Sequence, residues 1–255
     1  MAKTVHSSVD WADLEKGRLY VRDMPLERMV REHDFIDALY HTWLHKKPSP
    51  QQKRMLNAVL VCFAGGWSII PPVTFAARLA ATTKAPIAQC IAAAYCASGP
   101  SHTSAIEGVM AIYRDVELKD MESFVHSRLE KGGQIPGFGH PVVARDPRPV
   151  VMRKLCDELG MVGPAVRKFD VIESTLNGKK GIYGNVDGIN GAILNDLGFV
   201  EPSYGPALFL LGRSLSITAH ILEEYKNKPF EALKLVYPGF HQIDYGYDVS
   251  EGDGK

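Results

Sequence analysis

Apolar residues recur at spacings of three and four along most of the chain, which is the period of an α-helix with one buried face. The clearest run covers residues 25–44 and ends before Lys46-Lys47-Pro48, where lysines suit the negative end of a helix dipole and proline follows the helix end. Few segments alternate apolar and polar residues, so the chain is predicted to be mostly α-helical. The expected helices are residues 25–44, 50–64, 73–81, 86–97, 105–114, 119–130, 149–159, 163–176, 190–197 and 206–225, with Gly132, Gly160 and Gly178 as stops.

The charge balance narrows the classes of partner. Among 255 residues, 29 are Lys or Arg and 29 are Asp or Glu, so no net field attracts nucleic acid or an anionic membrane. The first residues, 1–6, lack the apolar core of a secretory signal, and the apolar stretch 58–70 is too short to span a membrane. The cysteines form no CxxC motif and are expected to be reduced. These features predict a cytoplasmic protein.

Two interruptions between the predicted helices hold a titratable side chain in apolar surroundings. Residues 98–104 place His102 beside a helix N-terminus, which disfavours a cation and favours a neutral imidazole that donates a hydrogen bond. A capping or core histidine is the commoner case at such a position. Residues 184–191 hold Asp187, which either caps the following helix or acts as a general base.

A third interruption, residues 132–141, is rich in glycine and contains His140. Glycines allow a backbone to pass close to a ligand. The spacing is not that of a dinucleotide-binding GxGxxG loop, and no predicted strand precedes it. Arg145 and Arg148 follow, and arginine can hold a carboxylate with two hydrogen bonds. Taken alone, this loop is as compatible with a structural role as with a functional one.

Together and in this order, the loops resemble those of the citrate synthase superfamily. The matching motifs are Gly99-Pro100-Ser101-His102, Gly137-Phe138-Gly139-His140 with Asp146-Pro147-Arg148, Asn185-Val186-Asp187, and Leu211-Gly212-Arg213-Ser214. The similarity touches nearly the whole chain. The chain is much shorter than the usual citrate synthases, and it looks more like citryl-CoA lyase and the C-terminal module of ATP citrate lyase.

This resemblance implies a citrate-synthase-like fold with two helical domains. Residues 1–103 and 188–255 would form the large domain, and residues 104–187 a smaller inserted domain that closes over the active site. It also implies a homodimer at least. The substrates would be a coenzyme A thioester and a small 2-oxo acid, with no tightly bound cofactor.

The resemblance also assigns roles to residues. Asp187 would remove or return the α-proton of the thioester, His102 would donate a hydrogen bond to the thioester oxygen, and His140 would polarise the second carbonyl. Arg148 and Arg213 would hold a substrate carboxylate. The residues expected beside coenzyme A are the loop backbone of Ile135, Pro136, Gly137, Phe138 and Gly139 and, unless they are ordinary solvated lysines, Lys179 and Lys180.

Two positions depart from the pattern of citrate synthases. Ser68 stands where synthases have a histidine that contacts oxaloacetate, and Ala232 stands where they have a second arginine. A polar substrate group left without its partner costs about 1–3 kcal/mol, and more if it is charged. With the apolar residues Trp67, Ile69 and Ile70 around it, Ser68 is expected to line a site for a less polar oxo compound.

The predicted function is therefore a carbon–carbon lyase or synthase that cleaves a 3-hydroxyacyl-CoA, such as citryl-CoA, into acetyl-CoA and a 2-oxo acid. The alternatives are a minimised citrate synthase, a lyase for a less polar substrate such as citramalyl-CoA, and a non-catalytic CoA-binding protein. No metal site is expected. His41 and His45 lie four residues apart on a predicted helix, but no third ligand is evident near them in the sequence.

Overall fold

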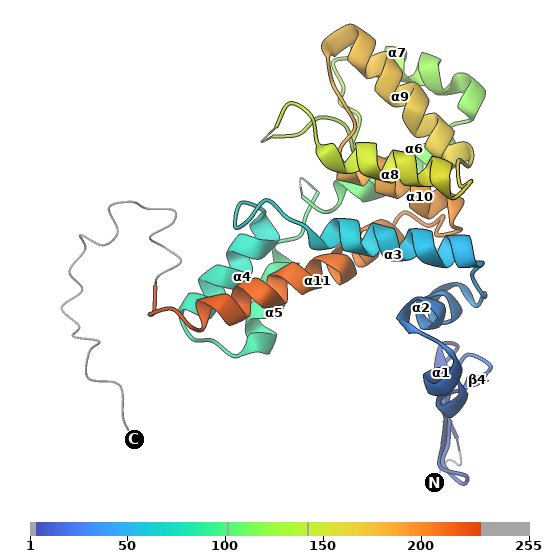
Figure 1. Ribbon diagram of the computed structural model, residues 1–255, viewed down its shortest axis with the longest axis vertical. Coiled ribbons are helices and arrows are strands. Elements are labelled where there is room, and N and C mark those ends of the chain that lie inside the picture. Colours follow the sequence, from blue (N-terminus) through green and yellow to red (C-terminus); the bar gives the residue numbers. More distant parts are fainter. Residues whose placement is uncertain (1–3, 101, 142, 231–255) are drawn as a thin grey trace, which may run out of the picture. The chain divides into compact units, whose positions relative to one another are not determined.

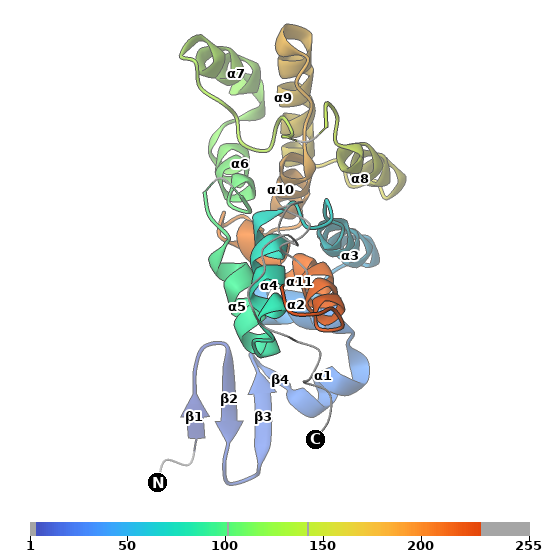
Figure 2. The same ribbon diagram turned by 90° about the vertical axis from the view of Figure 1, so that its left-hand side faces the viewer.

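The computed structural model of the chain describes residues 4–100, 102–141 and 143–230, which form eleven α-helices, a short 3-10 helix and one small sheet (Figures 1 and 2). The prediction of a mostly helical fold is confirmed. The helices are α1 (Leu26–Glu32), α2 (Phe35–Leu44), α3 (Pro50–Ala64), α4 (Pro72–Thr82), α5 (Ile87–Cys96), α6 (Ala105–Asp115), the 3-10 helix η1 (Leu118–Asp120), α7 (Met121–Glu130), α8 (Pro147–Glu158), α9 (Pro164–Lys180), α10 (Val186–Asp196) and α11 (Tyr204–Glu224).

The N-terminal sheet is a feature that the sequence pattern does not predict. Its antiparallel strands β1 (Thr4–His6), β2 (Asp10–Asp13), β3 (Arg18–Val21) and β4 (Met24–Pro25) follow one another in chain order. Trp11 and Tyr20 pair across β2 and β3 and stack with their ring centroids 3.9 Å apart. Strands of two to four residues are too short for an alternation of apolar and polar residues to stand out.

Most helix boundaries differ from the prediction by a few residues, and α10 begins at Val186, four residues before the predicted start at Asn190. The run 25–44 is two helices, because Asp34 caps α2 by accepting hydrogen bonds from the backbone N–H groups of Ile36 and Asp37, both at 3.1 Å. The prediction that Gly178 stops a helix is wrong, because α9 continues through it and ends at Gly181, whose φ is +65°. The other two glycine stops, Gly132 and Gly160, do follow the ends of α7 and α8.

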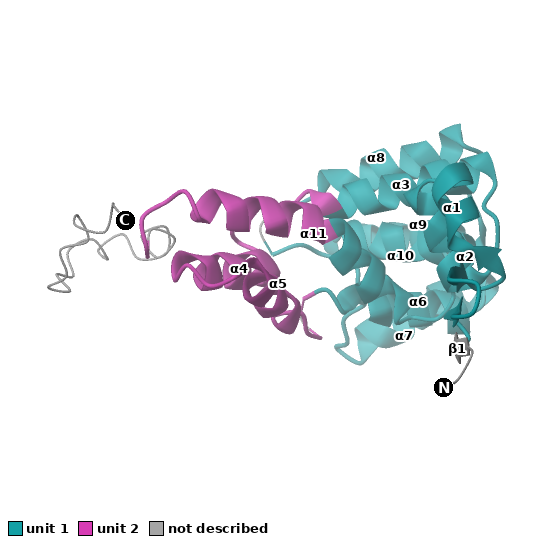
Figure 3. Cartoon of the chain, turned by 90° about the horizontal axis from the view of Figure 1, so that it is seen from below, with its two compact units in different colours: residues 1–63, 103–212 teal, residues 64–102, 213–255 magenta. Residues whose placement is uncertain are grey.

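The chain divides into two compact units, coloured separately in Figure 3. Unit 1 contains residues 1–63 and 103–212, and unit 2 contains residues 64–102 and 213–255. The expected small domain, residues 104–187, is part of unit 1, and its movement as a separate body remains a prediction.

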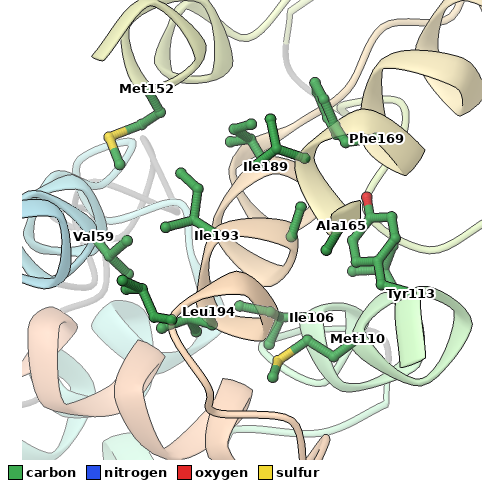
Figure 4. Close-up of a cluster of buried hydrophobic side chains, with 14 of the residues drawn as sticks. Val59, Ile106, Met110, Tyr113, Met152, Ala165, Phe169, Ile189, Ile193 and Leu194 are labelled. Atoms are coloured by element: carbon green, nitrogen blue, oxygen red, sulfur yellow. The ribbon is translucent and has the colours of Figure 1, made fainter. Parts of the chain in front are cut away.

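The core of unit 1 surrounds α10. Side chains from α3, α6 and α9 pack on it, and Figure 4 shows Ile189 and Ile193 among them. Both isoleucines are at most 2% exposed, and burying each side chain stabilises the fold by roughly 1.5–3 kcal/mol. Tyr113 on α6 donates a hydrogen bond from its hydroxyl to the Gly188 carbonyl oxygen at 3.0 Å. The helix that carries Asp187 in its first turn is therefore fixed by packing on several sides.

Unit 2 is built from α4, α5 and the C-terminal part of α11. Arg78 on α4 donates to the carboxylate of Glu224 on α11 from Nε at 3.1 Å and from Nη2 at 2.9 Å, and Glu224 is fully buried. By length and composition alone α11 is apolar enough to cross a membrane, a test that core helices of soluble proteins also pass.

Candidate active site

In unit 1, the glycine-rich loop and the segment before α10 are joined by backbone hydrogen bonds. Gly139 donates its N–H to the Tyr183 carbonyl oxygen at 2.8 Å, and Asn185 donates its N–H to the Gly137 carbonyl oxygen at 2.9 Å. The Asn185 side chain adds a third bond, from Nδ2 to the Gly139 carbonyl oxygen at 2.7 Å. The structure therefore brings together two of the loops that the sequence singled out, those of His140 and Asp187.

Two glycines make this junction possible. Gly137 has a φ of +80°, and a Cβ placed on it would lie 2.7 Å from the Cα of Gly188. A Cβ on Gly188 would lie 2.3 Å from the Gly137 carbonyl oxygen. Since real Cβ contacts are not this short, both positions require glycine, and the loop lies directly against the first turn of α10.

Asp187 lies in the first turn of α10 but does not cap the helix. The cap is Asn185, whose Oδ1 accepts the backbone N–H of Asp187 at 2.9 Å and that of Gly188 at 3.4 Å. The capping alternative for Asp187 is therefore wrong. A carboxylate in the first turn is favoured as an anion by the helix dipole, which suits a proton acceptor.

Asp146 links the N-termini of two helices. Its carboxylate caps α8 by accepting the Arg148 N–H at 3.0 Å and also accepts the Val186 N–H of α10 at 3.1 Å. The Arg148 side chain donates to it from Nε at 2.9 Å and from Nη2 at 2.7 Å. Burial acts to raise the pKa of Asp146, but these hydrogen bonds outweigh it and hold the pKa below its ordinary value of 3.8. Arg148, predicted to hold a substrate carboxylate, thus already holds a protein carboxylate.

His140 follows the glycine-rich loop and is partly buried. Its Nδ1 accepts the backbone N–H of Val143 at 3.2 Å. Burial lowers the pKa of His140; Arg148 lowers it further and Asp146 opposes the change. A neutral ring that accepts at Nδ1 carries its proton on Nε2, so Nε2–H is the group that can donate to a carbonyl oxygen.

The residues predicted to contact coenzyme A differ in exposure: Ile135 lies in the core of unit 1, whereas Lys179 and Lys180 are exposed. Ile135 is buried in the core at 5% exposure, and Phe138 stacks on Phe169 with centroids 5.5 Å apart. The loop therefore offers its backbone rather than these side chains. Lys179 and Lys180 are exposed in the last turn of α9, and Lys179 Nζ lies 2.5 Å from Nδ1 of His126.

A hollow that the sequence did not reveal lies beside Asp146. It encloses about 280 Å³, and its charged lining combines the basic side chains Arg145, Arg153 and Lys154 with the carboxylates of Asp146, Asp157 and Glu173. The guanidinium of Arg145 lies over the Tyr183 ring, 4.6 Å from its centroid. Arg153 is committed to Asp170 through its Nε, at 2.9 Å from Oδ1.

In unit 2, His102 and Arg213 act on each other electrostatically. His102 closes a tight turn in which its N–H and carbonyl oxygen both bond to Gly99 at 2.9 Å. Burial, aided by the positive charge of Arg213, lowers the pKa of His102 to about 4. The expected neutral imidazole is thus explained mainly by burial. The guanidinium of the buried Arg213 lies against Gly66, where a Cβ would be 2.6 Å from Nη1.

Ser68 is exposed and has a φ of +59°, a left-handed conformation that is uncommon for residues other than glycine. Ile70, two residues after Ser68, is 61% exposed, so an apolar side chain is exposed close to Ser68 in the sequence, as expected. The other departure, Ala232, lies outside the described residues, as does Ser101 in the first loop.

The sequence profile of the citrate synthase C-terminal domain matches residues 2–236. The chain belongs to the citrate synthase family. The predicted superfamily and citrate-synthase-like fold are thereby confirmed.

Known members and solved structures of the family cover different shares of this chain. Citrate synthase of Heyndrickxia coagulans is 27% identical over 205 residues, which are 78% of this chain and 54% of the relative. The structure of citryl-CoA lyase from Hydrogenobacter thermophilus matches with a TM-score of 0.82 and 26% identity over 98% of this chain and 95% of that chain. ATP citrate lyase from Methanothrix soehngenii, in complex with citrate and coenzyme A, matches with a TM-score of 0.74 and 19% identity, covering 98% of this chain and 43% of that chain. Citrate synthase from Thermotoga maritima matches with a TM-score of 0.62 and 20% identity, covering 98% and 94%.

The chain thus spans about half the length of the curated citrate synthases that it matches. The last two structures, which are below 25% identity, support the fold alone. The residues that sequence reasoning missed are Asp146 and Asn185 as organisers of the site. Both are good N-cap residues, and Asp146 precedes a proline, which is a recognised signal for a helix start.

Proposed function

We propose that this protein is a carbon–carbon lyase that cleaves a 3-hydroxyacyl-CoA of the citryl-CoA type into acetyl-CoA and a 2-oxo acid. The observation that carries the proposal is the end-to-end correspondence with citryl-CoA lyase, which combines 95% coverage of that chain with the TM-score of 0.82. The Thermotoga maritima citrate synthase has similar coverage but a TM-score of 0.62. Cleavage is therefore favoured over synthesis as the physiological direction.

In the proposed reaction, the Nε2–H of neutral His140 donates a hydrogen bond to the substrate's 3-hydroxyl oxygen, and the hydroxyl proton leaves to water as the carbon–carbon bond breaks. The bonding electrons pass into the enolate of acetyl-CoA, whose oxygen receives a hydrogen bond from neutral His102. Asp187, protonated at that stage, then gives a proton to the enolate carbon. The reverse reaction uses the same groups, with Asp187 as the base and the Nε2–H of His140 as the donor to the oxo acid.

Support for these roles comes from the protonation states of the three side chains. The pKa of His102 is lowered to about 4, so at neutral pH this side chain is uncharged and able to donate a hydrogen bond without a charge of its own. The Val143 N–H on Nδ1 of His140 keeps the proton of the neutral ring on Nε2, from which it can be donated to the substrate oxygen. The first turn of α10 favours the charged form of Asp187, which is the form that takes the α-proton in the reverse reaction and that remains after proton donation in cleavage.

The substrates and setting follow from the same proposal. Coenzyme A enters as a thioester substrate rather than as a bound cofactor, and the exposed basic residues Lys179 and Lys180 of unit 1 match the charge of its phosphates. We further propose a homodimer, as the family resemblance implies, and a cytoplasmic location.

A second candidate is a lyase for a less polar substrate such as citramalyl-CoA. The observation that favours it is Ser68, whose hydroxyl is shorter than a histidine side chain and cannot carry a positive charge toward a second carboxylate, and which is followed by the exposed apolar side chain of Ile70.

The deciding experiment follows the fate of citryl-CoA and citramalyl-CoA by mass spectrometry in D2O. Cleavage to acetyl-CoA that carries deuterium, together with the matching oxo acid, would support the lyase and identify its substrate. Release of coenzyme A with citrate would identify a citrate synthase that hydrolyses the thioester.

Two variants make the assay specific. Asp187→Asn should abolish cleavage and exchange, whereas Glu107→Gln, which alters an exposed carboxylate in the first turn of α6, should leave both unchanged. Absence of cleavage, exchange and condensation with acetyl-CoA and any oxo acid, in a wild-type protein that still binds coenzyme A, would favour the non-catalytic alternative.

A further inference from the structure

Three potential metal ligands meet at the edge of the N-terminal sheet in unit 1. Asp23 lies in the turn between β3 and β4, His41 lies in the last turn of α2, and His45 follows that helix as its C-cap. The Asp23 Oδ1 atom lies 3.2 Å from Nε2 of His41 and 2.9 Å from Nε2 of His45. The three ligand atoms all lie within 4.8 Å of one another. Asp23 is the third ligand that was not evident near the two histidines in the sequence.

The backbone on both sides of this cluster is held in place. Arg22, which precedes Asp23, donates from Nε to the Thr42 carbonyl oxygen on α2 at 3.0 Å, and its own carbonyl oxygen accepts the Trp11 Nε1–H at 3.0 Å. His45 has a φ of +52°, and its N–H bonds to the His41 carbonyl oxygen at 3.0 Å. These contacts fix the backbone segments that carry the carboxylate and the two imidazoles, and so hold the three side chains on facing elements.

The distances from Asp23 Oδ1 are those of hydrogen bonds and lie close to the separations of ligand atoms around a shared cation. Ligand bonds to zinc of about 2.0–2.2 Å in a tetrahedron put ligand atoms roughly 3.3–3.5 Å apart. The observed separations of 3.2 and 2.9 Å from Oδ1 are slightly shorter, so a small opening of the cluster admits the ion. A single carboxylate oxygen also faces both Nε2 atoms, which is the arrangement a metal would replace.

Two imidazoles with one carboxylate favour a borderline cation. Magnesium and calcium prefer an all-oxygen shell, whereas zinc accepts imidazole and carboxylate together. A fourth ligand can be water, and the Val21 carbonyl oxygen lies 3.2 Å from Nε2 of His41. His41 is largely buried, with a side-chain exposure of 12%, while Asp23 and His45 are exposed and accessible to an incoming ion.

We propose that Asp23, His41 and His45 form a zinc site that holds the β3–β4 turn against the C-terminal end of α2. The site is structural and lies apart from the residues to which chemistry was assigned in unit 1, so it stands independently of the proposed reaction. In the bound form each histidine coordinates through Nε2 and carries its proton on Nδ1.

The test is stoichiometric metal binding to the purified protein after removal of metal with a chelator. Calorimetry with zinc chloride should give one tight site per chain. Asp23→Asn and His45→Gln should each weaken that site roughly tenfold or more. His126→Gln is the matched control, because His126 lies on α7 near one carboxylate, Glu122, at 3.6 Å, and this variant should bind zinc as the wild type does.

Cobalt substitution identifies the ligands without relying on the variants alone. The wild type should show the visible bands of four-coordinate Co²⁺ with nitrogen and oxygen ligands. A thiolate charge-transfer band would place the metal on a cysteine and overturn the proposal. Equal zinc affinity in the wild type and in Asp23→Asn would also overturn it. So would the absence of a stoichiometric zinc site in the wild type. Far-UV circular dichroism of each variant shows that it is folded, and the wild-type cobalt spectrum tests the site even if one variant is not.

Discussion

Asn185 caps the helix whose first turn carries Asp187. Its Oδ1 accepts the Asp187 N–H at 2.9 Å, and its Nδ2 donates to the Gly139 carbonyl oxygen at 2.7 Å. The Asn185 side chain thus caps the N-terminus of α10 and also bonds this helix to the glycine-rich loop. The Asp187 carboxylate is not needed as the cap, which separates two roles that the sequence alone could not distinguish.

Substituting Asp187 should mainly lower turnover, whereas substituting Asn185 should mainly lower the free energy of unfolding. Asp187→Asn should lower turnover at least ~100-fold, since a general base contributes roughly that much, while the free energy of unfolding changes by less than about 1 kcal/mol. Asn185→Ala should lower the free energy of unfolding by about 2 kcal/mol, because a cap and a second hydrogen bond are lost. Urea unfolding and turnover of both variants are the measurements. A stability loss in Asp187→Asn with normal turnover would contradict the assignment.

The contact between Gly137 and Gly188 predicts a variant that damages the site from within the fold. In Gly188→Ala the new Cβ would meet the Gly137 carbonyl oxygen at 2.3 Å, so the loop must move away from α10. We expect a loss of about 1–3 kcal/mol in the free energy of unfolding and a lower kcat.

Gly178→Ala is the matched control for this variant. Gly178 lies inside α9, and a Cβ added there would meet nothing within 4 Å, so alanine should stabilise the helix by up to about 1 kcal/mol without changing kcat. Equal stability effects in the two variants, measured by urea unfolding, would show that the loop tolerates a side chain at position 188.

The lowered pKa of His102 predicts a pH dependence of stability. Between about pH 4 and the ordinary value of 6.5, the unfolded chain binds this proton and the folded chain does not. The free energy of unfolding therefore rises with pH across this window. Well above pH 6.5 His102 is neutral in both the folded and the unfolded chain, so it causes no further rise. His102→Gln should flatten the rise, measured as urea midpoints from pH 4 to 7. Part of the slope should remain, because burial also lowers the pKa values of His140 and His220. An unchanged slope would mean that His102 is not buried as described.

The sequence predicted most helices because their signals are local. Apolar spacing and stop residues act within one turn, and α3 begins and ends where that pattern placed it. The predicted stop at Gly178 was wrong because one glycine destabilises a helix by only about 1 kcal/mol, and the packing of α9 outweighs this cost. The short strands were not predicted because they are stabilised by pairing across the sheet, which an alternation pattern along one strand does not reveal.

The candidate site was predicted by its motifs but not by its contacts. His140 and Asp187 are 47 positions apart, and their loops are brought together by the hydrogen bonds of Gly137 and Gly139 with Tyr183 and Asn185. Asp23 and the histidines of α2 are likewise joined by the folding of the β3–β4 turn. Long-range pairings of this kind depend on tertiary packing, which a single sequence does not display.

Arg148 is predicted to be more important for stability than a surface arginine. Arg148→Met would leave the carboxylate of Asp146, 1% exposed, without its cation, and the expected cost is about 3 kcal/mol. The exposed pair of Arg28 with Glu32 provides the control, since Arg28→Met should leave the free energy of unfolding nearly unchanged. Asp146 stabilises the fold above its ordinary pKa of 3.8, and this contribution is lost as the pH falls through its lowered folded value. In Arg148→Met the acid sensitivity should therefore begin at higher pH.

Ser68→His tests which oxo acid the protein handles. The backbone φ of +59° at this position is one that histidine adopts more readily than most residues, so the substitution should not disturb the turn. A histidine that donates a hydrogen bond to a second carboxylate would add about 1.5 kcal/mol or more, equivalent to a roughly tenfold rise in kcat/KM for citryl-CoA relative to citramalyl-CoA. Ser68→Asn, which also suits this backbone but is shorter, should leave the ratio nearer that of the wild type. If the ratio of kcat/KM values does not change in Ser68→His, position 68 does not face the oxo acid, and the apolar surface of Ile70 has no bearing on substrate choice.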